Sequence, residues 1–174
     1  MMTRRLLILF VLVLGLPAYG VAQPAVFLVR HAERADTAPG AAPPMAAPMG
    51  GPADPDLSDS GRARAASLTV ALKDANITAI YATEFKRSQQ TAAPLAQALG
   101  LSVIIVPASS VATLVEKLRV LPGNALVVGH SNTLPEVVKA LGVKTAIQIP
   151  DTDYSNLFVV VRAREPVLVR LHYR

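Results

Sequence analysis

The apolar residues of this chain gather in short runs separated by segments of helical periodicity. The run 25–29 consists of β-forming residues without polar alternation, which is typical of a strand buried on both faces of a parallel sheet. The run 125–128 is also fully apolar. The strands predicted in this way are 25–29, 78–82, 102–106, 125–128, 157–162 and 167–171.

Helical patterns lie between these runs, and several begin with a residue suited to capping. Ser58 and Thr83 are each placed to cap a helix that follows them. Thr133 and Glu136 have the spacing of a capping box, with a proline in the first turn. Helix-ending residues follow the four patterns, namely Asn76, Gly100, Pro122 and Gly142. The predicted helices are 59–74, 84–99, 110–121 and 133–141.

Alternating strands and helices define the expected fold class. Such a chain is predicted to be α/β, a three-layer sandwich with a mostly parallel central sheet, helices on both faces and right-handed crossovers. The length of 174 residues suits one domain, which we assign to 23–174. Ligands of such sheets bind beyond the carboxyl ends of the strands.

The first 22 residues have the order of a secretory signal peptide. Arg4 and Arg5 precede the apolar run 6–16, and small residues follow it. The apolar run is short for a membrane span, so cleavage at Gly20 or Ala22 is favoured over the alternative of an uncleaved anchor. We therefore expect an exported protein, periplasmic or secreted, with no stable membrane association after signal cleavage.

Composition restricts the chemistry that the chain can perform. It contains no cysteine, which rules out disulfides, a thiolate nucleophile and a cysteine-ligated metal. The formal net charge of +5 falls to about +3 without Arg4 and Arg5. No basic cluster is interleaved with aromatic residues, so we expect a small anionic ligand and no nucleic acid.

One segment of the predicted domain lacks any periodicity. Residues 36–56 are dominated by Pro, Ala, Gly and Met, and neither the helical nor the strand repeat occurs in them. We interpret this segment as a long surface loop that could lie over a site.

Two of the three histidines follow predicted strands directly. His31 follows 25–29 with Arg30 beside it, and His130 follows 125–128 and a glycine. A guanidinium grips phosphate through paired hydrogen bonds, and a neutral imidazole is a nucleophile near neutral pH. Arg87, in the first turn of the helix after the second strand, can reach the same edge of the sheet, where helix amides also favour anions. These residues indicate a phosphoryl-transfer site.

The chain resembles the histidine phosphatase superfamily, in its phosphoglycerate mutase-like branch. The motifs that carry the resemblance occur in the family's order along nearly all of the predicted domain. They are Leu28-Val29-Arg30-His31-Ala32-Glu33, Leu57-Ser58-Asp59-Ser60-Gly61-Arg62, Thr83 to Thr91 with Arg87, and Gly129-His130-Ser131.

The resemblance implies a metal-independent phosphomonoesterase without a cofactor, acting on a small phosphorylated substrate. In it His31 is phosphorylated during turnover, while Arg30, Arg87 and His130 bind the phosphoryl group. Water then hydrolyses the phosphohistidine. Ala32 stands where many members have glycine, a change that we expect to be tolerated.

The proton donor for the leaving group is left open by these motifs. Ser131 follows His130 where the acid phosphatase branch has an aspartate, and the candidates are Glu33 and Glu116, with Asp36 as a weaker choice. Two alternatives therefore stay open, a phosphate-binding protein with little turnover and a phosphoglycerate mutase-like phosphotransferase. The oligomeric state is also open.

Two further features of the sequence are not assigned to a functional site. Asp151 and Asp153 could belong to a metal-binding loop, but aspartates in a turn are usually turn formers. His172 lies near the C-terminus, away from the motifs, and is assigned no role.

Overall fold

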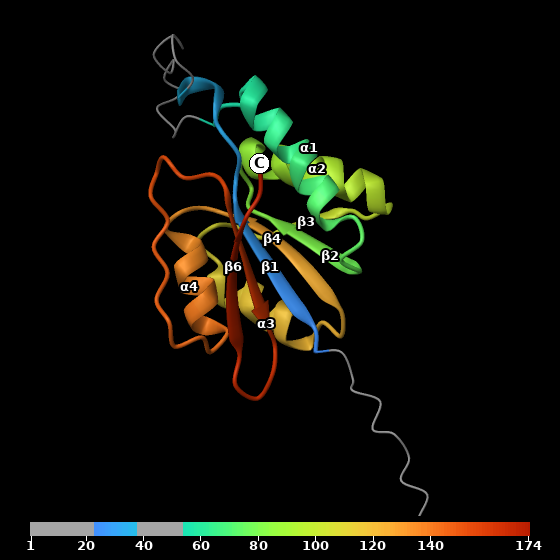
Figure 1. Ribbon diagram of the computed structural model, residues 1–174, viewed down its shortest axis with the longest axis vertical. Helices are drawn as coiled ribbons and strands as arrows, with labels where there is room; N and C mark the ends of the chain where they lie inside the picture. The colour runs from blue at the N-terminus through green and yellow to red at the C-terminus, as the bar shows by residue number, and fades with distance from the viewer. Residues whose placement is uncertain (1–22, 38–53) are drawn as a thin grey trace, which may run out of the picture.

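The computed structural model describes residues 23–37 and 54–174, and the predicted signal segment lies outside them. A six-stranded sheet runs through the middle of the domain in the order β3-β2-β4-β1-β5-β6 (Figure 1). Its strands are β1 (Ala25–Arg30), β2 (Ile77–Ala82), β3 (Val103–Ile105), β4 (Asn124–Gly129), β5 (Asn156–Val161) and β6 (Val167–His172).

Helices cover both faces of this sheet. On one face α1 (Asp59–Leu72) and α2 (Lys86–Leu99) pack through an apolar cluster that includes Leu68 and Leu95. On the other face α3 (Val111–Val120) and α4 (Thr133–Ala140) pack through a cluster that includes Leu118 and Leu134. Figure 1 shows the two helix pairs on opposite sides of the strands. The predicted α/β sandwich is confirmed.

The sheet is mixed, with its parallel part in the middle. β3, β2, β4 and β1 pair in parallel, whereas β5 pairs antiparallel with β1 and β6 antiparallel with β5. The register places Arg30 opposite Gly129 on β4 and Val29 opposite Leu157 on β5. Consequently the start of β5 lies at the same edge of the sheet as the carboxyl ends of the parallel strands.

Helix boundaries follow the predicted ones, and one predicted cap forms. The Ser58 hydroxyl accepts the backbone N–H of Gly61 at 3.1 Å, as expected of an N-cap. The first helix ends at Leu72, somewhat before the predicted end, and Asn76 takes a left-handed φ of 50° in the turn that follows.

Two predicted caps are wrong. The cap of α2 is Phe85 and that of α4 is Asn132, and neither makes a side-chain capping bond. The Thr83 hydroxyl instead donates to Ser88 at 2.7 Å, and Thr133 Oγ1 accepts the backbone N–H of His130 at 3.1 Å. Both hydroxyls are therefore used in the turns between strand and helix rather than on the helix amides.

The two ends of the predicted loop 36–56 lie side by side. Residues Ala35–Thr37 form a short 3-10 turn, and the backbone N–H of Ala35 donates to the carbonyl of Asp56 at 2.9 Å. Residues 38–53 of this loop lie outside the described residues. The described residues on either side of this segment are therefore close in space.

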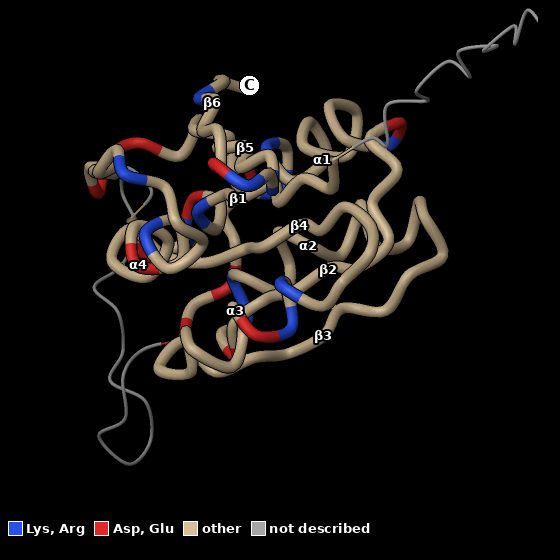
Figure 2. The backbone as a smooth tube through the Cα atoms, turned by 90° about the horizontal axis from the view of Figure 1, so that it is seen from below, with Lys and Arg blue, Asp and Glu red and all other residues tan. Residues whose placement is uncertain are grey.

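Charged residues are spread over several elements, and acidic and basic positions occur close together along the tube in Figure 2. The ion pairs include Arg64–Glu33 between α1 and the segment after β1. Among the described residues, no helix is both long enough and apolar enough to cross a membrane.

Candidate active site

His31 and His130 come together because their strands are neighbours. β1 pairs with β4 so that His31 follows directly after the Arg30–Gly129 pair, and the backbone N–H of His31 donates to the Gly129 carbonyl at 2.9 Å. The two imidazole rings lie 5.2 Å apart, centroid to centroid, in an edge-to-face arrangement. They are 4% and 8% exposed, respectively, so both lie at the buried floor of the site.

The hydrogen bond of His31 assigns its tautomer. Its Nδ1 lies 2.8 Å from the carbonyl oxygen of Ala32, which can only accept, so Nδ1 carries the proton and Nε2 keeps its lone pair. Burial lowers the pKa of His31 to about 3, although the hydrogen bond to Ala32 acts to raise it. The nearby charges of His130, Arg87 and Arg30 lower the pKa further. The imidazole is therefore neutral and nucleophilic near neutral pH.

His130 is fixed by the residue that was expected to cap α2. Its Nε2 lies 2.9 Å from Thr83 Oγ1, and the Thr83 hydroxyl donates its own proton to Ser88, so His130 Nε2–H is the donor in this pair. Burial lowers the pKa of His130 to about 4, with Arg87 and Arg30 lowering it further and Glu84 opposing them. Both histidines of the site are neutral without ligand.

Arg30 is held from the loop that precedes β5. Its Nη1 donates to the Pro150 carbonyl at 3.1 Å, its Cζ lies 4.2 Å from the centroid of the Tyr154 ring, and its Nη2 is 3.7 Å from Asp151 Oδ1. Its Nε is buried without a hydrogen-bond partner among the described residues. The guanidinium is thus fixed in place while part of its donor capacity remains free for an anion.

Arg87 lies in the first turn of α2, as predicted. Its guanidinium stacks on the Phe85 ring at 4.3 Å and donates to Asp54 Oδ1 at 3.4 Å. Burial lowers its pKa, with Arg34 acting in the same direction and Asp54 opposing, but an arginine so placed stays charged. Its Nε, like that of Arg30, is buried without a partner in the described part of the chain.

Thr91 ties the nucleophile segment to α2. Its hydroxyl oxygen accepts the backbone N–H of Ala32 at 2.9 Å and donates to the Arg87 carbonyl at 2.7 Å. Thr91 is fully buried. Because one hydroxyl holds both the residue after His31 and the backbone of Arg87, the spacing between nucleophile and arginine is fixed.

The predicted residues Arg30, His31, Arg87 and His130 line one open cleft at the carboxyl ends of the parallel strands. Residues of the loop before β5 and of the turn after β1 also line this cleft. The other lining residues are Arg34, Thr37, Phe85, Ala108, Ser131, Asn132, Thr133, Asp151 and Tyr154.

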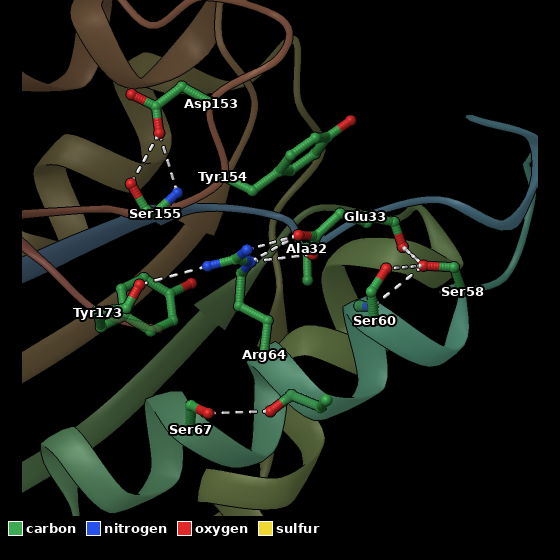
Figure 3. A network of polar contacts seen from close by, with 12 residues as sticks. Ala32, Glu33, Ser58, Ser60, Arg64, Ser67, Asp153, Tyr154, Ser155 and Tyr173 are labelled. Carbon is green, nitrogen blue, oxygen red and sulfur yellow. Dashed lines mark hydrogen bonds and ion pairs between the residues drawn. The ribbon is translucent and has the colours of Figure 1, made fainter. Parts of the chain in front are cut away.

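Neither predicted proton donor lines this cleft. Glu33 points away from it to α1, where its carboxylate accepts Arg64 Nε at 2.8 and 2.9 Å and Nη2 at 2.6 Å (Figure 3). Burial tends to raise the pKa of Glu33, but the hydrogen bonds from Arg64 outweigh burial and hold it below the ordinary value. Glu116 is exposed on α3, and Asp36 is paired with Arg34.

Sequence reasoning missed the part of the site that comes from the loop before β5. Asp151 and Tyr154 both line the cleft, whereas the sequence interpretation treated Asp151 and Asp153 as turn formers and gave neither a place in the site. Asp151 lies beside Arg30 and Ser131, whereas Asp153 accepts the N–H and hydroxyl of Ser155. The described residues contain no group of three or more His, Cys, Asp or Glu arranged to hold a metal ion.

His172 lies outside the cleft. Its Nδ1 is 3.0 Å from Ser155 Oγ, and the residue is exposed on β6.

Comparison with known proteins places this fold and site in a class. A family model described as the histidine phosphatase superfamily, branch 1, matches residues 26–109. The match contains Arg30, His31 and Arg87, so the resemblance to the histidine phosphatase superfamily that the motifs predicted is confirmed. No curated protein matches the sequence significantly.

Solved structures share the fold at low sequence identity. The protein histidine phosphatase SixA, solved with tungstate, is 18% identical and superposes with a TM-score of 0.65, covering 85% of this chain and 96% of its own. The mycobacterial glucosyl-3-phosphoglycerate phosphatase Rv2419c, solved with VO3, is 14% identical with a TM-score of 0.63, covering 87% and 100%. Both of these structural neighbours are phosphatases.

Proposed function

We propose that the protein hydrolyses phosphomonoesters without a metal ion, through a phosphoryl group attached to His31 Nε2. One observation carries the proposal: His31 is buried and neutral, has Nδ1 occupied by the Ala32 carbonyl, and lines the same cleft as Arg30, Arg87 and His130. A free Nε2 lone pair beside two guanidinium groups is the arrangement that attack on phosphorus requires.

In the first step His31 Nε2 forms a bond to phosphorus while the bond from phosphorus to the ester oxygen breaks. Arg30 and Arg87 hold the phosphoryl oxygens through guanidinium N–H groups that their contacts to Pro150 and Asp54 leave free, and His130 faces the same group. In the second step water attacks phosphorus and His31 leaves. No metal is needed, because the arginines stabilise the negative charge that develops on the phosphoryl oxygens.

The substrate class that we propose is a small phosphorylated compound. The oxyanions bound by SixA and Rv2419c support a phosphate-sized subsite in proteins of this fold. If the protein is exported, a sugar phosphate, an envelope glycan phosphate or a scavenged phosphoester is more accessible than a cytosolic phosphoprotein.

The test compares the wild-type protein with His31→Ala on p-nitrophenyl phosphate in the presence of a chelator. Wild-type activity should persist with chelator, and the variant should lose at least about 10³-fold in kcat/KM because the nucleophile is absent. Quenching a reaction of radiolabelled substrate with alkaline detergent should trap phosphate on the wild-type chain only, and that phosphate should be lost on later treatment with acid. Undiminished turnover by His31→Ala would refute the proposal.

A phosphate-binding protein with little turnover is the second candidate. It is favoured by one observation, that neither Glu33 nor Glu116 reaches the cleft. Such a protein would bind inorganic phosphate in calorimetry but release none from phosphomonoesters above background. A phosphoglycerate mutase-like phosphotransferase would instead return the phosphoryl group to an organic acceptor, which the same assay detects as substrate loss without phosphate release.

We further propose that the protein works after export, periplasmic or secreted. Cleavage at Gly20 or Ala22 would leave the whole of β1, which begins at Ala25. Mass spectrometry of the protein recovered from a bacterial expression host should find a mature N-terminus at one of these sites, and an intact Met1 in the recovered protein would contradict it.

A further inference from the structure

Every side-chain carboxyl group of the chain can be checked against the cleft. The sequence contains twelve Asp and Glu residues, and none falls in segments 1–22 or 38–53. All of them are therefore described. Among the residues that line the cleft, Asp151 alone is a carboxylic acid.

Other carboxylates near the rim are committed to structural partners. Asp54 accepts the backbone N–H of Lys86 at 3.0 Å, and Glu84 accepts that of Ala108 at 2.8 Å. Glu33 and Asp36 are paired with arginines, as described above. None of these groups can turn to a substrate without breaking a contact that fixes a turn.

Asp151 contacts residues on two sides of the cleft, Arg30 at the end of β1 and Ser131 after β4. Its Oδ1 is 3.7 Å from Arg30 Nη2 and accepts the hydroxyl of Ser131, the neighbour of His130, at 2.9 Å. Its side chain is 87% exposed, whereas His31 is 4% exposed. The carboxyl group thus lies on the open side of the cleft and the nucleophile on its floor.

This arrangement matches the direction of phosphoryl transfer. Attacking and leaving atoms lie roughly in line on opposite sides of phosphorus. When His31 attacks from the floor, the leaving oxygen faces the open side, where Asp151 lies.

We propose that Asp151 is the catalytic acid and base of the reaction, an inference that rests on the proposed function. In the first step its carboxyl proton passes to the leaving oxygen as the phosphorus–oxygen bond breaks and the His31–phosphorus bond forms. In the second step the Asp151 carboxylate takes a proton from the attacking water, inorganic phosphate is released, and His31 returns to its neutral form. Protons and charge balance over the cycle.

The experiment measures kcat/KM of Asp151→Asn on a series of phosphomonoesters with leaving groups of increasing basicity, from p-nitrophenyl through phenyl to an alkyl phosphate. A weakly basic leaving group needs little protonation, so the variant should stay within about tenfold of wild type on p-nitrophenyl phosphate and lose about 10²–10⁴-fold on the alkyl ester. The decrease of kcat/KM with increasing leaving-group basicity should therefore be steeper in Asp151→Asn than in the wild-type protein.

Asp153→Asn is the matched control, because Asp153 lies in the same loop but accepts hydrogen bonds from Ser155 and pairs with Arg170. It should leave the dependence on leaving group unchanged. Thermal melting of both variants checks that the fold is kept, and Asp151→Glu, which retains the acid, should recover part of the alkyl phosphate activity.

A loss that is uniform across the series, or no loss, would overturn the role of Asp151. That result is distinguishable from failure of the proposed function, which would appear as unchanged turnover in His31→Ala. If His31→Ala is inactive while Asp151→Asn keeps the wild-type dependence, the phosphohistidine mechanism stands and Asp151 is not its acid.

Discussion

The guanidinium carbon of Arg30 lies over the ring of Tyr154, 4.2 Å from its centroid, although 124 positions separate the two residues in the sequence. The Tyr154 hydroxyl is also 3.4 Å from Arg30 Nη2, a long and weak hydrogen bond. Arg30 therefore depends for its orientation on an aromatic face from the far end of the chain.

Removing this face should weaken phosphate binding. Tyr154→Ala is expected to raise the inhibition constant for inorganic phosphate by about 2–30-fold, as loss of a cation–π contact of ~0.5–2 kcal/mol would do. Tyr154→Phe keeps the ring and should remain within about threefold of wild type. Competitive inhibition assays with both variants check this, and equal effects of the two would show that the hydroxyl matters instead of the ring.

Stability should fall on mild acidification. Burial lowers the pKa of His31 to about 3 and that of His130 to about 4, against a value of 6.5 for free histidine. Below about pH 6.5 the unfolded chain takes up protons that the folded chain refuses, so the free energy of unfolding decreases as pH falls. Urea denaturation at about pH 7 and about pH 5 should give a lower value at pH 5.

The double variant His31→Asn with His130→Asn isolates this effect. Its unfolding free energy should change less between the two pH values, since neither asparagine titrates. The carboxylates with lowered pKa values, Glu33 and Asp36, titrate in the folded chain below this window and do not obscure it. An unchanged pH dependence in the double variant would assign the acid sensitivity to other groups.

Glu33 should prove to be a positioning residue. Glu33→Gln removes the charge that holds Arg64, which also donates to the Tyr173 carbonyl at 3.3 Å, and is expected to cost ~1–2 kcal/mol of stability for this partly exposed pair. Its kcat/KM should fall by the same factor on good and poor leaving groups. Glu116→Gln, on exposed α3, should change stability by less than about 0.5 kcal/mol and activity not at all. A leaving-group-dependent loss in Glu33→Gln would restore it as a proton donor.

Gly61 should resist replacement, because there is no room for a side chain beside the nucleophile segment. A Cβ at this position would overlap the Glu33 carbonyl oxygen and lie 3.1 Å from its carbonyl carbon. Gly61→Ala is expected to destabilise by ~1–3 kcal/mol or more, since backbone must shift. Gly100→Ala meets open space and only the strain of φ 65°, about 1 kcal/mol. Thermal unfolding measures the loss of stability in both variants. A smaller loss in Gly61→Ala than in Gly100→Ala would contradict the close contact at Gly61.

Much of the fold follows from local pattern. The order of strands and helices was predictable because each element carries its own periodicity, and Arg30, His31, Arg87 and His130 were predictable because each follows a strand or opens a helix at one edge of a parallel sheet. The Ser58 cap followed from the same local logic.

The remaining features depend on partners far away in the sequence. Thr83 and Thr133 resemble caps, but neighbouring residues of the site take their hydroxyls. Glu33 was a candidate proton donor because it lies two residues from His31, yet its carboxylate is held by Arg64, 31 positions further along the chain. Asp151 entered the site only because β5 runs antiparallel to β1, a direction that periodicity does not encode.

The bond from Arg30 to the Pro150 carbonyl has a consequence for the order in which the protein becomes competent during its synthesis. The bond spans 120 positions, and the strand that carries Arg30 is the first of the described chain. A nascent chain that ends before Pro150 already contains every recognised motif, yet nothing fixes this guanidinium. Such distant pairings also form slowly. Catalytic competence should therefore arrive abruptly, once the last two strands have joined the sheet.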